Sequence, residues 1–456
     1  MFVALAIVLW FVAAVVALAR PKWGAALIWP AIWLYPNGPL YGTLPLNVRF
    51  DDLWLVFMFL LAISFARGKG GGPLFWLAMA WAVSLILGDF VGFFITGGAD
   101  WQTIVKAGLK TLHVPMIVYV LNVFIVHEQD AVDHLKAMVV AGAAAAILGI
   151  VMVYFPQALK MFLIPSAKVV GFQVVTALEA IEEHDVLSRR AQGSLGFMGQ
   201  ATMLMSIGLL CLWMMLYYAN RGARLLFAVT LGISVVGLAY TITRNAIGGF
   251  MAGMVWGVVF TRRRMPLVGL LALGALALVI QGQGGLLDRV LLRVTGPGGT
   301  SATPFMEGLL LRFDIWHKFV ANFSPVYLFT GMGMTSVRMV AKSTAHNSYL
   351  GAFVYSGLTG AVVLYLILAR AVRLGVNLRR YGQDGFSQGL GAWLCSLVVA
   401  LCLAAFFIEL FQQPLKMQVL FAAMVVADKQ LARVRAAAEP RPSLVPEPGG
   451  GLLAYP

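Results

Sequence analysis

Residues 137–155 read AMVVAGAAAAILGIVMVYF, nineteen consecutive positions without a charged side chain. A helix of about 20 apolar residues crosses the hydrocarbon layer of a bilayer, and about a dozen stretches of this chain have that character. Of the 456 residues, 61% are hydrophobic and 11% are charged, whereas roughly a quarter of a soluble domain is charged. Strands of alternating polarity are absent from the sequence, so helices are the remaining way to satisfy the backbone inside lipid. The sequence therefore predicts an all-α, polytopic membrane bundle.

We expect about 12 to 13 membrane-spanning helices, each near the length that a bilayer requires. The first run is followed, rather than preceded, by basic residues, which favours an uncleaved helix over a signal peptide. The second and last runs are short. The expected runs lie near residues 1–19, 23–36, 53–66, 73–95, 103–126, 132–155, 200–219, 225–243, 245–261, 265–281, 349–369, 390–409 and 413–428.

Lysine and arginine form short clusters between these runs, which accounts for the net charge of +14. If the N-terminus lies outside, every tight basic cluster falls on one side of the membrane, as cytoplasmic loops require. We therefore reject a nucleic-acid partner as the reason for the charge. The same orientation predicts an inner-membrane protein whose two longest loops lie in the periplasm.

These loops divide the chain into predicted regions. They are an N-terminal bundle at 1–281 with a periplasmic loop at about 156–199, a large periplasmic loop at 282–348, C-terminal membrane helices at 349–428 and a disordered cytoplasmic tail at 429–456. No internal repeat is visible, which counts against the transporter folds that are built from duplicated halves.

The large loop is expected to contain amphipathic helix. The segment 305–323 has the period of a helix, and its apolar residues fall on one face. That predicted face consists of Leu309, Phe313, Trp316 and Val320.

Arginine is disfavoured in short outward-facing loops, so the arginines found there are unusual. Arg244 lies between two apolar runs that leave no room for a long loop, so its guanidinium sits at the membrane surface or just inside it. Such a group is a functional hypothesis by default; the alternative is that it snorkels to lipid phosphates. Arg189 and Arg190 precede another run. Because guanidinium forks match phosphate oxygens, these arginines indicate a diphosphate site.

Three further residues could serve such a site. Lys106 and Lys110 begin the fifth run and share a helical face through their i,i+4 spacing. They either extend the basic surface or anchor the helix at the interface. His346 ends the large loop directly before a run, where an imidazole can accept a proton from a hydroxyl near neutral pH.

The remaining histidines share no spacing, so we interpret them as structural or incidental. The cysteines lie in apolar runs without a CxxC pair and are expected to be packing residues, so neither a metal site nor a cofactor is predicted. The cysteines are Cys211, Cys395 and Cys402.

The chain from Arg312 to Gly360 resembles the O-antigen ligase and polymerase superfamily of bacterial membrane glycosyltransferases. Thr243-Arg244-Asn245 is similar to the family's Ser-Arg element, and Arg190 with residues 193–200 is similar to its Arg-x-x-Gly element. The resemblance covers roughly residues 190–365. Its four ordered elements are Arg312-Phe-Asp-Ile-Trp316, Phe329-Thr-Gly331-Met-Gly333, His346-Asn347-Ser348-Tyr349-Leu350 and Gly357-Leu-Thr-Gly360.

The resemblance implies a transferase that moves a glycan from undecaprenyl diphosphate to an acceptor hydroxyl in the periplasm, without a nucleotide sugar or a metal. Arg190 and Arg244 would bind the diphosphate, His346 would act near the acceptor, and Arg312 would assist. Arg189 and Asn347 join this set as substrate-binding candidates. Thr243 stands where the family usually has Ser, and the adjacent Arg189/Arg190 pair leaves the active arginine open. These residues do not distinguish between lipid A-core and a growing polysaccharide as the acceptor, so a ligase and a polymerase are both possible.

Two other readings remain open. A transporter or flippase for a lipid-linked glycan would use intramembrane acids such as Asp89 and Glu409 as an ion relay, but it has no need for the long loop with His346. A non-catalytic scaffold of an envelope assembly complex would tolerate His346→Ala.

Overall fold

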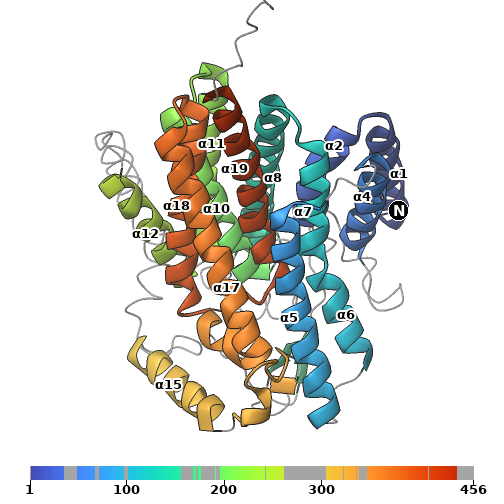
Figure 1. Ribbon diagram of the computed structural model, residues 1–456, viewed down its shortest axis with the longest axis vertical. Coiled ribbons are helices and arrows are strands. Elements are labelled where there is room, and N and C mark those ends of the chain that lie inside the picture. The colour runs from blue at the N-terminus through green and yellow to red at the C-terminus, as the bar shows by residue number, and fades with distance from the viewer. Residues whose placement is uncertain are drawn as a thin grey trace, which may run out of the picture.

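The computed structural model is a bundle of helices (Figure 1). The all-α prediction is confirmed for the described part of the chain apart from one antiparallel hairpin, β1 (Lys168–Val170) with β2 (Gln173–Val175), in which Val169 pairs with Val174. The structure describes residues 2–34, 49–66, 71–96, 101–155, 168–170, 173–175, 191, 196–241, 243–260, 305–321, 323–334, 336–337, 347–408 and 410–438.

Helices account for nearly all of these residues. In chain order they are α1 (Phe2–Ala19), α2 (Pro21–Ala26), α3 (Ile28–Leu34), α4 (Phe50–Ala66), α5 (Pro73–Thr96), α6 (Trp101–Thr111), α7 (His113–Phe124), α8 (Glu128–Tyr154), α10 (Gly196–Tyr217), α11 (Arg221–Thr241), α12 (Arg244–Phe260), α15 (Phe305–Ala321), the short 3-10 helix η5 (Pro325–Tyr327), α17 (Ser348–Tyr381), α18 (Gly385–Ala405) and α19 (Pro414–Ala438).

Seven stretches among the described helices are long and apolar enough to cross a membrane. They comprise α5, α6 with α7, α8, α10, α11, α17 and α18. The helices α1, α4, α12 and α19 coincide with four more expected runs but are shorter or more polar. The expected second run is divided at Leu27 into α2 and α3, and the run at 265–281 lies outside the described residues. These seven stretches are consistent with a multi-pass membrane protein, whereas the total of 12 to 13 spans stays a prediction.

Helices α10 and α18 form the centre of the bundle, and α12 packs against both from its edge (Figure 1). Small residues let the backbones approach closely. A Cβ added to Gly249 of α12 would lie 2.7 Å from the carbonyl oxygen of Ala400 in α18. Across the same core, the buried indole of Trp393 donates a 3.1 Å hydrogen bond to the carbonyl of Ser206 in α10. The three helices are therefore fixed in register near the end where α12 begins.

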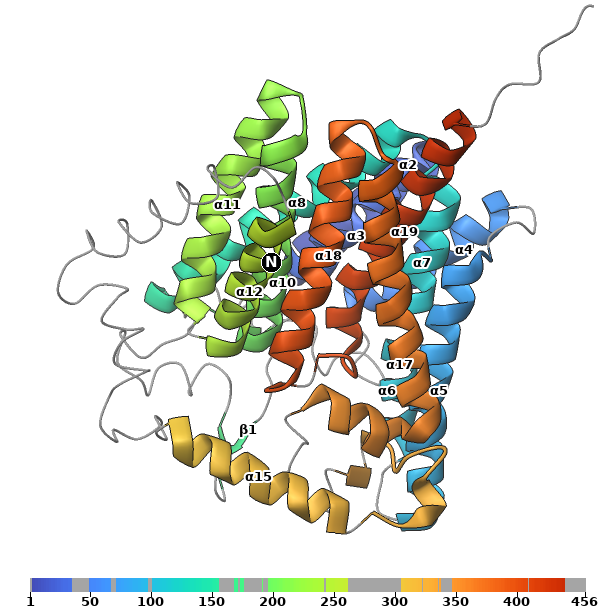
Figure 2. The ribbon, with the colours of Figure 1, turned by 60° about the vertical axis from the view of Figure 1, so that its left-hand side comes forward.

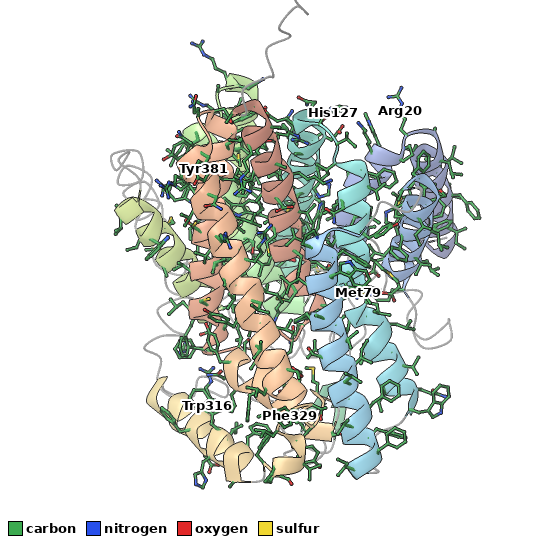
Figure 3. All side chains as sticks on the ribbon, in the orientation of Figure 1. Arg20, Met79, His127, Trp316, Phe329 and Tyr381 are labelled. Carbon is green, nitrogen blue, oxygen red and sulfur yellow. The ribbon has the colours of Figure 1, made fainter. Side chains whose placement is uncertain are left out.

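The two ends of the bundle differ in charge. Arg20, His127 and Tyr381 mark one end, which we call the basic end, and Trp316 and Phe329 mark the other, which we call the α15 end (Figure 3). Ion pairs and hydrogen bonds tie distant segments together at the basic end, among them Lys22–Asp130 at 2.8 Å and Arg433 to the carbonyl of Val126 at 2.9 Å. Helices α8, α11 and α18 begin at the basic end and α17 and α19 finish there (Figures 1 and 2). The basic clusters between these helices thus gather at one end, as the sequence predicts.

Helix α15 lies across the opposite end of the bundle (Figure 2). The predicted helix at 305–323 is confirmed as α15. Of its predicted apolar face, Phe313 is 52% exposed and Trp316 is half-buried, and the side chains of Leu309 and Val320 lie outside the described residues. The described residues that pack on the core include Phe319, which is 5% exposed, and Ile315. An apolar stripe alone does not say which neighbour covers it, so the sequence pattern could not choose between these faces. The packed face includes Arg312, which is half-buried.

Helix α17 is broken at Gly357, and the break is filled by residues 328–333, which we call the strap. Gly357 has φ 64° and ψ −162°, a conformation suited to glycine. Two N–H groups beyond the break donate to the strap, from Leu358 to the Leu328 carbonyl at 2.8 Å and from Thr359 to the Phe329 carbonyl at 3.3 Å. In return, the strap N–H groups of Met332 and Gly333 donate to the carbonyls of Val354 and Tyr355 at 2.8 and 3.0 Å. The strap therefore pairs the two N–H groups and the two carbonyls of α17 that would otherwise bond to each other across the break.

Candidate functional site

Arg244 is the first residue of α12, and α11 ends only three positions earlier at Thr241. The carbonyl of Thr243 accepts 3.1 Å hydrogen bonds from the N–H groups of Ala246 and Ile247, which starts the helix. The expected tight hinge between two apolar runs is therefore present. Arg244 is half-buried and lies at a helix N-terminus, where the backbone dipole adds to its positive charge. This location favours an anionic ligand.

Arg312 of α15 lies close enough to Arg244 for the two guanidinium groups to repel each other. Burial, and then the positive charge of Arg244, lower the pKa of Arg312 below its ordinary value. The guanidinium carbon of Arg312 lies 5.6 Å from the centroid of the Phe407 ring, a cation–π distance. Two half-buried cations from distant parts of the sequence thus converge. Like charges held together in this way are a feature of sites that receive an anion.

The segment 406–411 brings the start of α17 beside Arg312. The Asn347 amide nitrogen donates to the carbonyl of Phe406 at 3.2 Å. The buried hydroxyl of Ser348 donates to the carbonyl of Ile408 at 2.8 Å and accepts from the N–H of Leu410 at 2.6 Å and of Phe411 at 3.4 Å. Phe407, the residue beneath Arg312, is therefore held by bonds on both sides to the first residues of α17.

Asn347 has a structural task in this arrangement. Its side-chain oxygen accepts hydrogen bonds from the N–H groups of Tyr349 at 2.9 Å and Leu350 at 3.0 Å, which caps α17. With its nitrogen bonded to Phe406, little of this amide is left for a ligand. A substrate-binding role for Asn347 stays a prediction, and the geometry favours capping.

Three expected site residues, Arg189, Arg190 and His346, lie outside the described residues. The chain neighbours of two of them are described. Ala191, which follows Arg190, is buried and donates its N–H to the carbonyl of Tyr240 at 3.0 Å, one turn before the hinge that leads to Arg244. Asn347 follows His346 and is fastened beside Phe407. The described parts of all the expected site elements except Lys106 and Lys110 thus meet toward the α15 end.

Lys106 and Lys110 belong to a different cluster, and the structure does not bring them to Arg244 and Arg312. Helix α6 packs against α5 and α7, on the far side of the bundle from α12 (Figures 1 and 2). The electrostatic neighbours of Lys110 are Arg49, Asp52, Asp51 and Lys106.

This second cluster lies at the start of α4, where Arg49, Asp51 and His113 are buried. Arg49 forms a two-point ion pair with Asp51, one bond of which is 2.9 Å, and its backbone N–H donates to Asp52 at 2.7 Å. His113 approaches Asp52 at 3.2 Å. The two acids balance the two cations, buried Arg49 and half-buried Lys110, so the cluster resembles a neutralised structural core more than an open anion site.

Sequence reasoning missed Lys416. It lies in the first turn of α19, it is buried, and it follows the buried Gln412 at a spacing of four residues. The available signal was an ionisable side chain inside the last apolar run, where such groups are costly and therefore informative.

Comparison with known proteins adds no family assignment. No family model matches the chain, and no curated protein matches it. Among the described residues, no group of three His, Cys, Asp or Glu side chains is placed to hold a metal ion.

Proposed function

We propose that this chain is a membrane glycosyltransferase of the O-antigen ligase type, which moves a glycan from undecaprenyl diphosphate to an acceptor hydroxyl at the periplasmic face of the bacterial inner membrane. The acceptor is lipid A-core or a growing polysaccharide. The observation that carries the proposal is the convergence of Arg244 and Arg312, two cations whose mutual repulsion a diphosphate would relieve.

In the proposed reaction the acceptor oxygen forms a bond to the anomeric carbon of the glycan, and the bond from that carbon to the diphosphate oxygen breaks. The electron pair leaves with undecaprenyl diphosphate, and the acceptor proton passes to the imidazole of His346 as general base. Arg244, Arg312 and Arg190 stabilise the negative charge that develops on the leaving group. Because the guanidinium groups supply the compensating positive charge, we expect no metal ion to be needed.

The test uses the purified full-length protein in liposomes, with a glycan on undecaprenyl diphosphate, an acceptor and EDTA. We expect transfer in the wild type, and a loss of about 100-fold or more in Arg244→Ala, Arg312→Ala and His346→Ala, the size seen when a charge-stabilising group is removed. Lys318→Ala is the matched control, because Lys318 is an exposed cation on the same helix as Arg312, paired with Asp314 at 2.6 Å. Full activity in both Arg244→Ala and His346→Ala would refute the assignment.

A transporter of lipid-linked glycans is the second candidate. The observation that favours it is the charged cluster, buried or half-buried, of Arg49, Asp51, Asp52, Lys110 and His113. An ion-coupled transporter would depend on these groups. The test uses liposomes that carry a fluorescent lipid-linked glycan. Two results together would select this function over the transferase: the wild type flips the lipid without transferring its glycan to an acceptor, and Asp52→Asn abolishes the flipping.

A further inference from the structure

The start of α19 holds polar side chains where the bundle is otherwise apolar. Gln412 is 4% exposed and Lys416 is 5% exposed. Gln413 begins the helix, since its carbonyl accepts from the N–H groups of Lys416 at 3.0 Å and Met417 at 3.3 Å. Helix α19 packs against α7, α17 and α18, so these polar groups point into a bundle interior and not into water.

Gln412 has one half of its amide satisfied and the other half orphaned. Its nitrogen donates to the carbonyl of Ser348 at 2.6 Å, in the first turn of α17. Its oxygen, which is buried, has no hydrogen-bond partner within the part of the chain that the structure describes. An unpaired buried acceptor costs about 1–3 kcal/mol. A ligand that brings a hydroxyl donor would recover this loss.

Lys416 contributes the complementary chemistry. An ammonium group has three donors and no acceptor, so it can hold an anionic oxygen beside its contacts within the protein. A buried ammonium together with an orphaned amide oxygen fits a ligand that presents an anionic oxygen and a hydroxyl close together.

Segment 406–413 links these two residues to the candidate site. Phe407 lies beneath Arg312, Asn347 bonds to Phe406, and Gln412 bonds to Ser348. The polar start of α19 thus continues directly from the segment that contacts Arg312 and the N-terminus of α17.

We propose that Lys416 and Gln412 bind the glycosyl phosphate part of the lipid-linked donor, with the Lys416 ammonium on a phosphate oxygen and the Gln412 Oε1 accepting from a sugar hydroxyl. This inference rests on the proposed function and adds a donor-sugar subsite to it.

Binding to the full-length protein in detergent tests the proposal, with native mass spectrometry as the readout. The ligands are a glycan on undecaprenyl diphosphate, undecaprenyl diphosphate itself, undecaprenol and phosphatidylglycerol. Lys416→Met is expected to weaken both diphosphates about 10-fold or more, the effect of losing a charge-assisted hydrogen bond. Gln412→Met is expected to weaken only the glycan-bearing lipid. Undecaprenol and phosphatidylglycerol should be insensitive to both changes.

Lys429→Met is the matched control, because Lys429 lies on the same helix near the basic end, and it should bind all four lipids as the wild type does. Thermal unfolding of the ligand-free proteins checks that each variant remains folded. Wild-type binding of both diphosphates by Lys416→Met would overturn the inference, as would an equal loss of undecaprenol or phosphatidylglycerol.

The two proposals fail separately. If Arg244→Ala and His346→Ala transfer glycan at full rate, the proposed function is wrong. If both are inactive while Lys416→Met and Gln412→Met bind and turn over the donor normally, only the donor-sugar subsite is wrong.

Discussion

Ser348 is the residue on which the geometry of the candidate site depends most. Its buried hydroxyl joins three backbone groups of the 406–411 segment to the start of α17. Ser348→Ala would leave the N–H groups of Leu410 and Phe411 and the carbonyl of Ile408 without this partner. We expect a loss of about 1–3 kcal/mol in the free energy of unfolding, measured by denaturation in detergent.

Ser396 provides the control for this change. It is also a buried serine on a bundle helix, but its hydroxyl has no hydrogen-bond partner in the described part of the chain. Ser396→Ala removes an unsatisfied group and should be neutral or stabilising. Equal destabilisation by the two substitutions would show that the Ser348 bonds contribute nothing specific.

For single residues, the sequence predicted which side chains matter better than it predicted which residues they contact. Arg244 could be predicted because its position between two apolar runs is visible in a hydropathy pattern. Its proximity to Arg312 depends on how α15 crosses the bundle, which no local pattern encodes. Lys106 and Lys110 have the same charge and the same predicted side of the membrane, yet they join Arg49 in another cluster. Charge and predicted side of the membrane do not determine which cations meet.

Among the secondary-structure elements, α17 carries the sharpest stability prediction. A Cβ added to Gly357 would lie 2.4 Å from the carbonyl of Phe329, in a backbone conformation that other residues avoid. Gly357→Ala should therefore destabilise the protein by about 2 kcal/mol or more, as measured by thermal unfolding.

The comparison is Gly232→Ala in α11. Gly232 lies inside a helix with nothing within 4 Å of an added Cβ, so alanine should raise stability by about 0.5–1 kcal/mol through its higher helix propensity. A Gly357→Ala protein as stable as the Gly232→Ala protein would mean that the helix closes the break without the strap.

Helix positions could be predicted from the sequence more closely than helix ends. The expected run at 73–95 corresponds to α5, but the run at 349–369 stops twelve residues before α17 ends at Tyr381. Hydropathy falls where Arg370 begins a charged stretch, although the helix continues and Arg370 pairs with Asp428 of α19 at 2.6 Å. In the sequence the strap could be predicted only as a glycine-containing loop. Its hydrogen bonds join residues 328–333 to residues 354–359, and a local pattern does not show such pairs.

For the whole molecule, the separation of charge between the two ends yields a test of orientation. Residue 129 is exposed near the basic end and residue 318 is exposed on α15. After the three native cysteines are replaced, Lys318→Cys should react with a membrane-impermeant maleimide added to cells whose outer membrane is permeable. Gln129→Cys should react only after the inner membrane is opened, because basic loops are retained in the cytoplasm.

Labelling of both positions from the same side would contradict a bundle that spans the membrane between these ends. The reverse pattern would place Arg244 and Arg312 in the cytoplasm and exclude a periplasmic transferase site.

The break in α17 also bears on how the protein is made. A membrane-crossing helix with open backbone groups is poorly suited to lipid, which offers them no hydrogen bonds. The strap precedes α17 in the sequence, so it is synthesised before the helix whose open backbone groups it pairs with. A circular permutation that moved the strap to the C-terminus would reverse this order. The open backbone groups of α17 would then have no strap to pair with until the last segment of the chain was made.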